Sequence, residues 1–478
     1  MLFRSHFYFS KGNDFLTSVN LACKDLKGSY ALAVLCKHEP EKIIATRKDS
    51  PLVIGKGTNE FFISSDIPAY LALTKNFYFL DDFDIAIISK DDIEFFNSDL
   101  EKISKEIKSV EWSAEAADKN GYDDYMLKEI FEQPKAIRET IGTCLQSEKT
   151  QIDGLEISKD YLKTINKIFI VACGTAMHAG LATKKMFEEF SYIQTEVDLA
   201  SEFRYRNPLV DEKSLCIYIS QSGETADTIA ALKLAKSKGA KTIAISNVIG
   251  SSITREADFC IYTHAGPEIA VASTKAYTSQ IALLTILAIY FGEILENTDS
   301  KISILKKELL EIPSKIEITL EKMKEIKEIA DCIYTNKDVF FIGRGIDYAV
   351  ALEASLKLKE ISYIHSEAYA SGELKHGPIA LIEDGTPLIS IITDEKLLEK
   401  SISNIQEVIT RGAKTFVISS LVTEKNNFDK IINIPSVSEY ISPLISVIPL
   451  QLLAYYISKN KGLDVDKPRN LAKSVTVE

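Results

Sequence analysis

The sequence lacks the cysteine patterns that mark metal-binding or disulfide-stabilised proteins. It has seven cysteines, scattered from Cys23 to Cys332, and none of them forms a C-x-x-C pair. Paired, regularly spaced cysteines are the usual sign of a zinc site or a disulfide framework. Most of these cysteines lie in apolar runs, as reduced core cysteines do. We therefore predict no metal, no cofactor and a reducing, cytoplasmic location.

A basic excess is also missing. The chain has 56 Lys and Arg residues against 68 Asp and Glu residues, which gives a net charge of -12. Nucleic-acid binding needs a basic surface that neutralises phosphates, and no helix-turn-helix pattern is visible. The sequence therefore predicts no nucleic-acid partner.

Long, uninterrupted hydrophobic runs are absent as well. The apolar run at 281–291 is too short to span a bilayer, and the run at 441–457 is broken by Pro443 and Pro449. The first ten residues carry Arg4 and His6 in a stretch too short for a signal peptide. We expect no membrane partner, and we interpret 441–457 as the end of a buried helix.

An internal repeat is the main organisational signal. The strand-and-glycine pattern at 168–174 recurs at 339–345, and the segment at 239–246 recurs at 412–419. In each copy strands alternate with helices, which is typical of a parallel sheet covered on both faces. The sequence thus predicts an α/β fold with two doubly wound domains. The charged helical stretch at 301–337, with a break at Pro313, is expected to be a solvated connector between them.

The N-terminal part has a different texture. After a helix expected over 13–25, residues up to about 110 form short strand-like runs separated by turn signals. This pattern predicts an α+β region with antiparallel strands. Residues 111–145 are expected to be a helical linker with a break at Pro134.

A polar loop at 220–225 lies between an apolar strand pattern at 215–219 and a helical pattern at 226–237. A strand that ends in such a loop and continues as a helix directs backbone N–H groups and the positive end of the helix dipole at one point. The alternative is that Ser222 or Thr225 only caps the helix. Because Ser220 and Gln221 add further donors, we predict a phosphate site.

Several motifs together resemble the glucosamine-6-phosphate synthase family, the isomerising glutamine:fructose-6-phosphate aminotransferases. They are Cys-Gly-Thr at 173–175, Ser-Gln-Ser-Gly-Glu-Thr at 220–225, Val-Ala-Ser-Thr-Lys-Ala at 271–276, Lys-Leu-Lys-Glu at 357–360, Glu-Leu-Lys-His-Gly-Pro at 373–378 and the C-terminal segment at 468–478. The resemblance covers nearly the whole chain in the same order. It implies a homodimer that converts fructose 6-phosphate and ammonia to glucosamine 6-phosphate.

The resemblance also implies a division of the chain. The expected parts are a partial glutaminase-type (Ntn hydrolase) domain lacking its N-terminal half at 1–110, a helical linker at 111–150, a first sugar-isomerase (SIS) domain at 151–297, a helical connector at 298–327, a second SIS domain at 328–462 and a catalytic C-terminal tail at 463–478.

Four residues receive catalytic roles from the resemblance. Glu360 moves a proton between C1 and C2, and a carboxylate suits that step. His376 opens the sugar ring from the neighbouring subunit, and Lys473 forms a Schiff base with the open sugar or holds its carbonyl oxygen. Lys357 completes the motif. Without the resemblance, we would interpret Glu353, Lys357 and Glu360 as a salt-bridged, solvated helix face. His376 would be a surface loop residue and Lys473 part of a frayed terminus.

The resemblance assigns nine residues to substrate binding. They are Thr175, Ser220, Gln221, Ser222, Thr225, Val271, Ser273, Glu353 and Ala472. Thr175 is expected to join the loop at 220–225 in holding the sugar phosphate.

One departure from the family pattern concerns nitrogen. The family's glutaminase uses a cysteine at the start of the mature chain, whereas this chain begins Met1-Leu2-Phe3, and Cys23 and Cys36 fall at other places. We expect that this chain alone does not hydrolyse glutamine and that ammonia is free or comes from a separate glutaminase fragment. Two other functions stay open: isomerisation of fructose 6-phosphate to glucose 6-phosphate alone, and non-catalytic sugar-phosphate binding.

Overall fold

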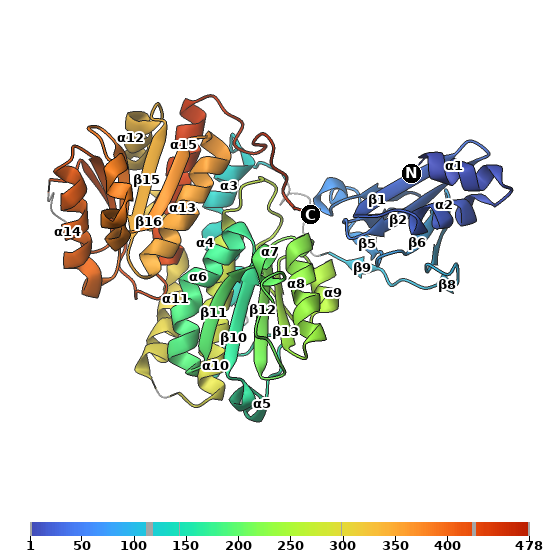
Figure 1. Ribbon diagram of the computed structural model, residues 1–478, viewed down its shortest axis with the longest axis horizontal. Helices are drawn as coiled ribbons and strands as arrows, with labels where there is room; N and C mark the ends of the chain where they lie inside the picture. The colour runs from blue at the N-terminus through green and yellow to red at the C-terminus, as the bar shows by residue number, and fades with distance from the viewer. Residues whose placement is uncertain (1, 111–117, 143, 298, 423–426, 477–478) are drawn as a thin grey trace.

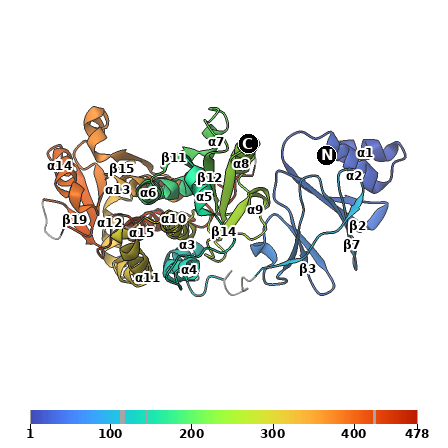
Figure 2. The same ribbon diagram turned by 90° about the horizontal axis from the view of Figure 1, so that it is seen from below.

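The chain folds into three parts, which a computed structural model describes for residues 2–110, 118–142, 144–297, 299–422 and 427–476. Two α/β domains lie next to each other, and the N-terminal region lies to one side of the first of them (Figures 1 and 2). The C-terminal tail, followed up to residue 476, runs toward the junction between the N-terminal region and the α/β domains (Figure 1).

The N-terminal region holds two antiparallel sheets. One has the order β1-β2-β6-β7-β8 and the other β4-β3-β5-β9. Their apolar faces share one core, which includes Ala45, Ile54 and Tyr78. The expected α+β class with antiparallel strands is confirmed. The strands are β1 (Tyr30–Cys36), β2 (Glu39–Lys48), β3 (Val53–Lys56), β4 (Phe61–Ser64), β5 (Asn76–Phe79), β6 (Ile85–Ile88), β7 (Ile93–Phe96), β8 (Lys102–Ile103) and β9 (Lys108–Ser109).

Helices precede and follow these sheets. The region opens with α1 (Leu2–Ser10) and α2 (Phe15–Lys24), and Asp14 caps α2 by accepting a hydrogen bond from the Thr17 N–H. The linker contains α3 (Tyr125–Phe131) and α4 (Gln133–Ile141), with Pro134 in the first turn of α4, where proline is tolerated. The predicted linker also includes 111–117 and 143, which lie outside the described residues.

The first α/β domain has a five-stranded parallel sheet of order β11-β10-β12-β13-β14. Its strands are β10 (Lys167–Ala172), β11 (Gln194–Leu199), β12 (Ser214–Ser220), β13 (Lys241–Ser246) and β14 (Phe259–Tyr262). Its helices are α5 (Lys159–Thr164), α6 (Gly174–Ser191), α7 (Ala200–Phe203), α8 (Ala226–Ser237), α9 (Ser252–Glu256) and α10 (Lys275–Ile294).

Alternating residues of β10 explain why both faces of this sheet are covered. Ile168 and Ile170 pack on the side of α6 and α10, while Phe169 and Val171 pack on the side of α7 and α8. A strand that is apolar at every position can bury both faces. The doubly wound arrangement predicted from the repeat is confirmed.

The second α/β domain repeats this design, with the order β16-β15-β17-β18-β19. Its strands are β15 (Asp338–Gly343), β16 (His365–Ala370), β17 (Pro387–Ile392), β18 (Lys414–Ser419) and β19 (Lys430–Asn433). The main helices are α13 (Ile346–Ser362), α14 (Leu398–Ile409) and α15 (Pro443–Asn460), with short 3₁₀ turns at Ser371–His376 and Pro378–Leu381.

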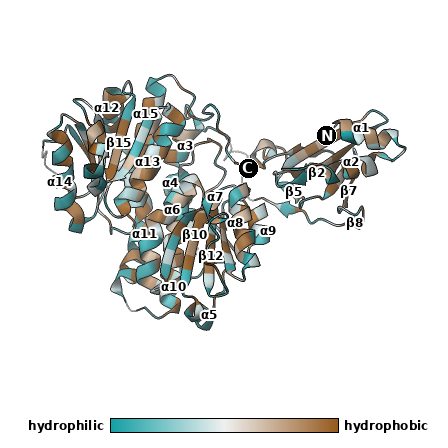
Figure 3. Cartoon of the chain, viewed as in Figure 1, coloured by the Kyte–Doolittle hydropathy of each residue, from teal (hydrophilic) through white to brown (hydrophobic). Residues whose placement is uncertain are grey.

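The two α/β domains share one continuous apolar core. Helices α6 and α13 pack against each other, and buried residues such as Phe187, Leu284, Leu358 and Leu453 belong to a single cluster that reaches both sheets. Brown, apolar segments run through the strands and helices of both domains (Figure 3). The seam between the repeats is therefore part of the apolar core.

Four expectations about helices were wrong, at least in part. The apolar run at 281–291, which was expected to be too short to cross a membrane, is part of helix α10. The 20 residues of α10 are enough to cross a membrane by length and composition, but 83% of its most apolar stretch is buried inside the protein, as in a core helix. Helix α11 (Ser300–Leu320) continues through Pro313, and the break comes at Glu321, before α12 (Met323–Ile333). The connector is only partly solvated, since one face of α11 packs into the core, with Leu309 and Ile316 buried.

The segment at 441–457 is not the end of a helix. It is most of α15, which begins at Pro443 and contains Pro449.

Candidate functional site

A buried polar cluster lies where the first turns of α6 meet the middle of α13. The Lys357 ammonium donates to the Thr175 hydroxyl at 2.9 Å, and that hydroxyl donates to the Glu353 carboxylate at 3.0 Å. Lys357 also pairs with Glu360 at 2.6 Å and with Glu353 at 3.4 Å. The structure thus joins four predicted site residues across the domain seam.

The interpretation of these residues as a solvated helix face is wrong. Glu353 is 0% and Lys357 1% exposed, while Glu360 is only half-buried at the edge of the cluster. Burial favours the neutral amine of Lys357, but the charges of Glu353 and Glu360 outweigh it, so the pKa of Lys357 is raised. A buried ammonium held by two carboxylates leaves the outer one, Glu360, accessible for chemistry.

His178 is a member of this cluster that the sequence did not reveal. Its Nδ1 lies 2.7 Å from Oε2 of Glu353, and the ring is buried. The signal was its spacing: His178 follows Thr175 by three positions on α6 and therefore shares its helix face. Glu353 is consequently fixed by Thr175, His178 and Lys357 together.

The polar loop joins β12 to α8 as predicted. Gly223 has φ +70°, and a Cβ there would meet the Ser251 hydroxyl at 2.0 Å, so the tight turn requires glycine. The Thr225 side chain makes no capping bond to α8 and contacts the Ser220 hydroxyl at 3.0 Å instead. The hydroxyls of Ser220 and Ser222 accept hydrogen bonds from the N–H groups of Gly223 and Glu224, so the loop is held by its own side chains and is not a simple helix cap.

The C-terminal tail lies against this loop. The backbone carbonyl of Val475 accepts a hydrogen bond from the N–H of Ala226, the first residue of α8, at 3.2 Å. Farther back, the Arg469 N–H donates to the Tyr363 hydroxyl at 2.8 Å. The tail described here, up to residue 476, is thus tied to both α/β domains, and residues 477–478 lie outside the described residues.

Lys473 of the tail is anchored by a carboxylate that the sequence also did not reveal. Its ammonium donates to Oε2 of Glu268 at 2.5 Å and to the Ala270 carbonyl at 2.8 Å. Glu268 also accepts from the Ser273 hydroxyl at 2.7 Å and from the Thr274 N–H at 2.9 Å. Ser273 and Lys473, both predicted site residues, therefore share one partner.

The charge state of Glu268 follows from these contacts. Complete burial alone would raise the pKa of this carboxyl, but the Lys473 charge and the hydrogen bonds outweigh it and hold the pKa at about 2. Glu268 is therefore ionised at neutral pH. Its place, three residues before Val271 in a loop of small and apolar residues, was the available sequence signal.

One cavity of about 350 Å³ brings loop and tail together. Gln221 and Ser222 line it from the loop, Ala472 and Lys473 from the tail, and Glu268 from the floor. Residues of the N-terminal region, including Leu52 and Ile67, close the opposite side. A small polar substrate held here would meet hydroxyl and amide donors at one end and an amine at the other.

His376 lies apart from these groups. It is exposed at the end of the 3₁₀ turn Ser371–His376, before Gly377, whose φ is +141°. Within the described residues no hydrogen bond or ion pair joins it to Glu360 or Lys473. Of the predicted catalytic side chains, the chain thus pairs Lys357 with Glu360, holds Lys473 on Glu268 and leaves His376 exposed.

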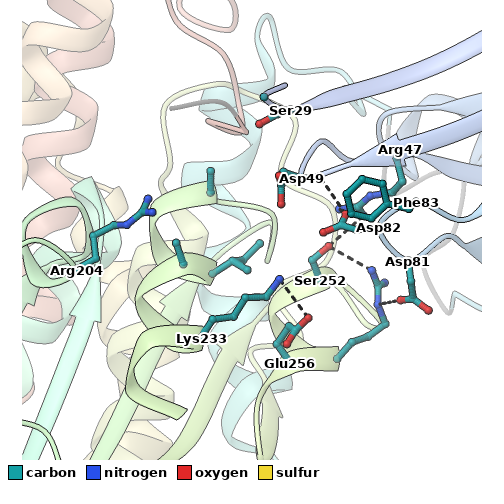
Figure 4. Close-up of a pocket in the computed structure, with 15 residues that line it drawn as sticks. Ser29, Arg47, Asp49, Asp81, Asp82, Phe83, Arg204, Lys233, Ser252 and Glu256 are labelled. Carbon is teal, nitrogen blue, oxygen red and sulfur yellow. Dashed lines mark hydrogen bonds and ion pairs between the residues drawn. The ribbon is translucent and has the colours of Figure 1, made fainter. Parts of the chain in front are cut away.

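A larger cavity, of about 850 Å³, separates the N-terminal region from α8 and α9. Arg47 reaches from β2 across the junction, bonding Ser252 at 3.1 Å and pairing with Asp82 at 3.1 Å (Figure 4). On the far wall Lys233 pairs with Glu256 (Figure 4). Since these cations already face carboxylates, the cavity has no unbalanced charge that would select an anion.

A metal site is not evident in the part of the chain that the structure describes: no three His, Cys, Asp or Glu side chains gather there.

Comparison with known proteins places these features in a family. Residues 161–290 and 332–458 match the SIS domain family. The isomerizing glutamine–fructose-6-phosphate aminotransferase of Clostridium tetani is 54% identical over 98% of this chain and 78% of its own length. That of Caldanaerobacter subterraneus is 53% identical over the same shares.

Solved structures of related proteins share the fold of the two α/β domains. The C-terminal domain of glucosamine-fructose-6-phosphate aminotransferase from Francisella tularensis covers 73% of this chain, with a TM-score of 0.71 and 40% identity. A glucosamine-6-phosphate deaminase from Thermotoga maritima, 24% identical with a TM-score of 0.59 over 74% of the chain, shares the fold. With these identities over nearly its whole length, the chain belongs to the isomerizing glutamine–fructose-6-phosphate aminotransferase family of enzymes.

Proposed function

We propose that this enzyme forms glucosamine 6-phosphate from fructose 6-phosphate and ammonia. The observation that carries the proposal is the shared cavity: the loop residues Gln221 and Ser222 and the tail residue Lys473 line one space large enough for a six-carbon sugar phosphate. The family to which the chain belongs supports the choice of substrate.

The loop at 220–225 binds the sugar phosphate in this proposal. Backbone N–H groups before α8 and the side chains of Ser220, Gln221, Ser222 and Thr225 supply donors, and the helix dipole favours the anion. The backbone of Val271 and Ala472 and the hydroxyl of Ser273 line the sugar end, with Thr175 and Glu353 fixing the base of the site.

Lys473 attacks the C2 carbonyl of the open-chain ketose. Schiff-base formation needs a neutral amine, so the Lys473 ammonium first gives up the proton that it carries in its ion pair with Glu268, and water leaves as the bond between C2 and the nitrogen becomes an imine. The sugar carbonyl is held beside the amine by the phosphate contacts. Ammonia then displaces the lysine at C2, which regenerates the free amine of Lys473 and leaves an imine of the substrate.

Glu360 moves the proton from C1 to C2. Its partner Lys357 orients the carboxylate, and Glu353, which contacts His178, holds Lys357 in turn. Proton return at C2 gives the aldose with its amino group. One positioned general base of this kind accelerates proton transfer by a factor of about 10² to 10⁴.

His376 opens the ring from the partner subunit. Its exposure, and its separation from Glu360 within one chain, support a site completed by a second copy. We therefore propose a homodimer as the active species, located in the cytoplasm.

Ammonia, not glutamine, is the nitrogen donor for this chain alone. Cys23 is buried, and burial raises the pKa of its thiol, which disfavours the nucleophilic thiolate. Cys36, the other cysteine of the N-terminal region, is the last residue of β1. A separate glutaminase fragment that delivers ammonia fits the same scheme.

The test compares products. Purified protein is incubated with fructose 6-phosphate and ammonium, or with glutamine, and glucosamine 6-phosphate and glucose 6-phosphate are quantified. We expect glucosamine 6-phosphate with ammonium only. Glucose 6-phosphate alone indicates an isomerase, and binding without product, unaffected by Glu360→Gln, indicates a sensor. Glucosamine 6-phosphate from glutamine without added ammonium overturns the nitrogen assignment.

A further inference from the structure

A buried carboxyl of the linker helix α3, that of Glu129, contacts the backbone next to Glu268, the residue that binds Lys473. Glu129 is 2% exposed, and its Oε1 accepts hydrogen bonds from the Ile269 N–H at 2.5 Å and the Ala270 N–H at 3.2 Å. Those residues follow Glu268, which pairs with Lys473. Glu129 thus holds the backbone of 269–270, which lies next to the two groups that bind the Lys473 ammonium.

Ala270, whose N–H is bonded to Glu129, also contacts Lys473 through its carbonyl oxygen. The Ala270 carbonyl accepts a hydrogen bond from the Lys473 ammonium at 2.8 Å, while the N–H of the same residue is held by Glu129. The N–H and the C=O of Ala270 lie on two consecutive planar peptide units that meet at the Ala270 Cα, so holding the first unit limits how far the second can move.

The start of α3 holds the tail itself. The Asp466 carboxylate accepts from the N–H groups of Tyr125 at 2.9 Å and Met126 at 2.8 Å, as a cap does at a helix N-terminus. The Asp466 carbonyl accepts from the Val271 N–H at 3.0 Å. Helix α3 therefore holds the tail at its first residues and the loop at 268–271 through Glu129 in its last turn.

From this geometry we infer that Glu129 is a positioning residue for Lys473, which it holds through the loop at 268–271 in the orientation that the sugar carbonyl requires. The role of Lys473 in this inference rests on the proposed function. Glu129 contacts no predicted sugar-binding side chain, so its effect passes through the backbone.

The charges around Glu129 favour its neutral form. Burial and then the Glu268 charge raise the pKa of the Glu129 carboxyl to about 8, against the opposing charges of Lys473 and Lys275. Among the described residues its Oε2 has no hydrogen-bond partner. A neutral carboxyl keeps Glu268 as the one anionic partner of Lys473 at this place.

Two variants separate positioning from mere packing. Glu129→Gln keeps an acceptor oxygen for the two N–H groups, whereas Glu129→Met keeps the length of the side chain and removes the acceptor. The matched control is Asp258→Asn, since Asp258 also accepts from a backbone N–H, that of Thr242 at 2.9 Å, away from Lys473.

The first measurement does not depend on activity. Hydrogen exchange of the segments 268–271 and 466–473 is expected to rise about tenfold or more in Glu129→Met, because a lost buried acceptor leaves N–H groups unpaired. Glu129→Gln and Asp258→Asn leave both segments protected. Unchanged exchange in Glu129→Met, or an equal rise in Asp258→Asn, overturns the inference.

The second measurement is kinetic. In Glu129→Met we expect kcat with fructose 6-phosphate and ammonium to fall about tenfold while KM for the sugar changes less than about threefold, because the phosphate loop is untouched. An unchanged kcat, or a loss confined to KM, contradicts positioning of Lys473. If the unaltered enzyme makes no product, the proposed function fails, and hydrogen exchange still decides the role of Glu129.

Discussion

The ammonium of Lys473 lies 2.5 Å from the carboxylate of Glu268, although the two residues are 205 positions apart. Glu268 is fully buried and Lys473 is about one quarter exposed. The pair pins the end of the chain to the loop that follows the first sheet.

Removing the lysine is therefore expected to destabilise the fold as well as stop the reaction. Lys473→Met leaves Glu268 buried without its cation, which costs about 3 kcal/mol of unfolding free energy. Urea unfolding measures this loss, and Lys473→Met combined with Glu268→Gln should recover part of it. A single variant as stable as the unaltered protein contradicts the pairing.

Glu360→Gln tests the proton transfer. The amide cannot take the proton from C1, so we expect turnover to fall about 10² to 10⁴-fold while the protein stays folded, because Glu360 is half-buried at the edge of its cluster. Product formation and the thermal midpoint are measured together. Glu383→Gln, an exposed change in the same domain, serves as control, and equal activity of the two variants would remove Glu360 from the mechanism.

Mixing two inactive variants tests whether His376 acts between subunits. Glu360→Gln and His376→Ala protein, unfolded and refolded together in equal amounts, form heterodimers in which one site has both intact residues. We expect about a quarter of the unaltered activity in the mixture, from random pairing of a two-fold dimer. If each site takes His376 from its own chain, the mixture stays inactive.

The buried Glu129 gives the stability a defined pH dependence. Its pKa is raised from the model-compound value of 4.5 to about 8, so the folded state keeps a proton that the unfolded chain releases. Stability from this group is complete below pH 4.5 and is lost as the pH rises towards 8. Compared with Glu129→Gln, the unaltered protein should lose unfolding free energy across this range.

Urea unfolding at several pH values follows this difference. Asp258→Asn is the matched control, because the Thr242 hydrogen bonds and Lys241 lower the pKa of Asp258 despite the opposing effect of burial, which confines its contribution to more acidic conditions. Parallel curves for Glu129→Gln and the unaltered protein between pH 4.5 and 8 would show that Glu129 is ionised throughout.

The sheets could be predicted from the sequence because each strand carries its own signal. The run at 168–172 is apolar at every position, which only a strand buried on both faces tolerates, and its copy at 339–343 has the same texture. Helices were harder where proline lies among apolar residues. At Pro313 tertiary packing of one helix face outweighs the lost backbone hydrogen bond, and no local pattern reports that packing.

The site was predictable only where a motif was contiguous. Glu360 and Lys357 lie on one helix, three positions apart, and their ion pair follows from that spacing. Glu268 and Lys473 meet only through the path of the tail, and His178 reaches Glu353 across the seam. Contacts between distant segments depend on how helices cross, which neither composition nor period encodes.

The seam between α6 and α13 has a consequence for the two repeats as units. Thr175 and His178 come from one copy and Glu353 and Lys357 from the other, so neither copy by itself contains the polar cluster. Two equivalent halves have become dependent on each other: isolated from its twin, each would expose half of a charged core to solvent. The two repeats together thus form one shared centre instead of two.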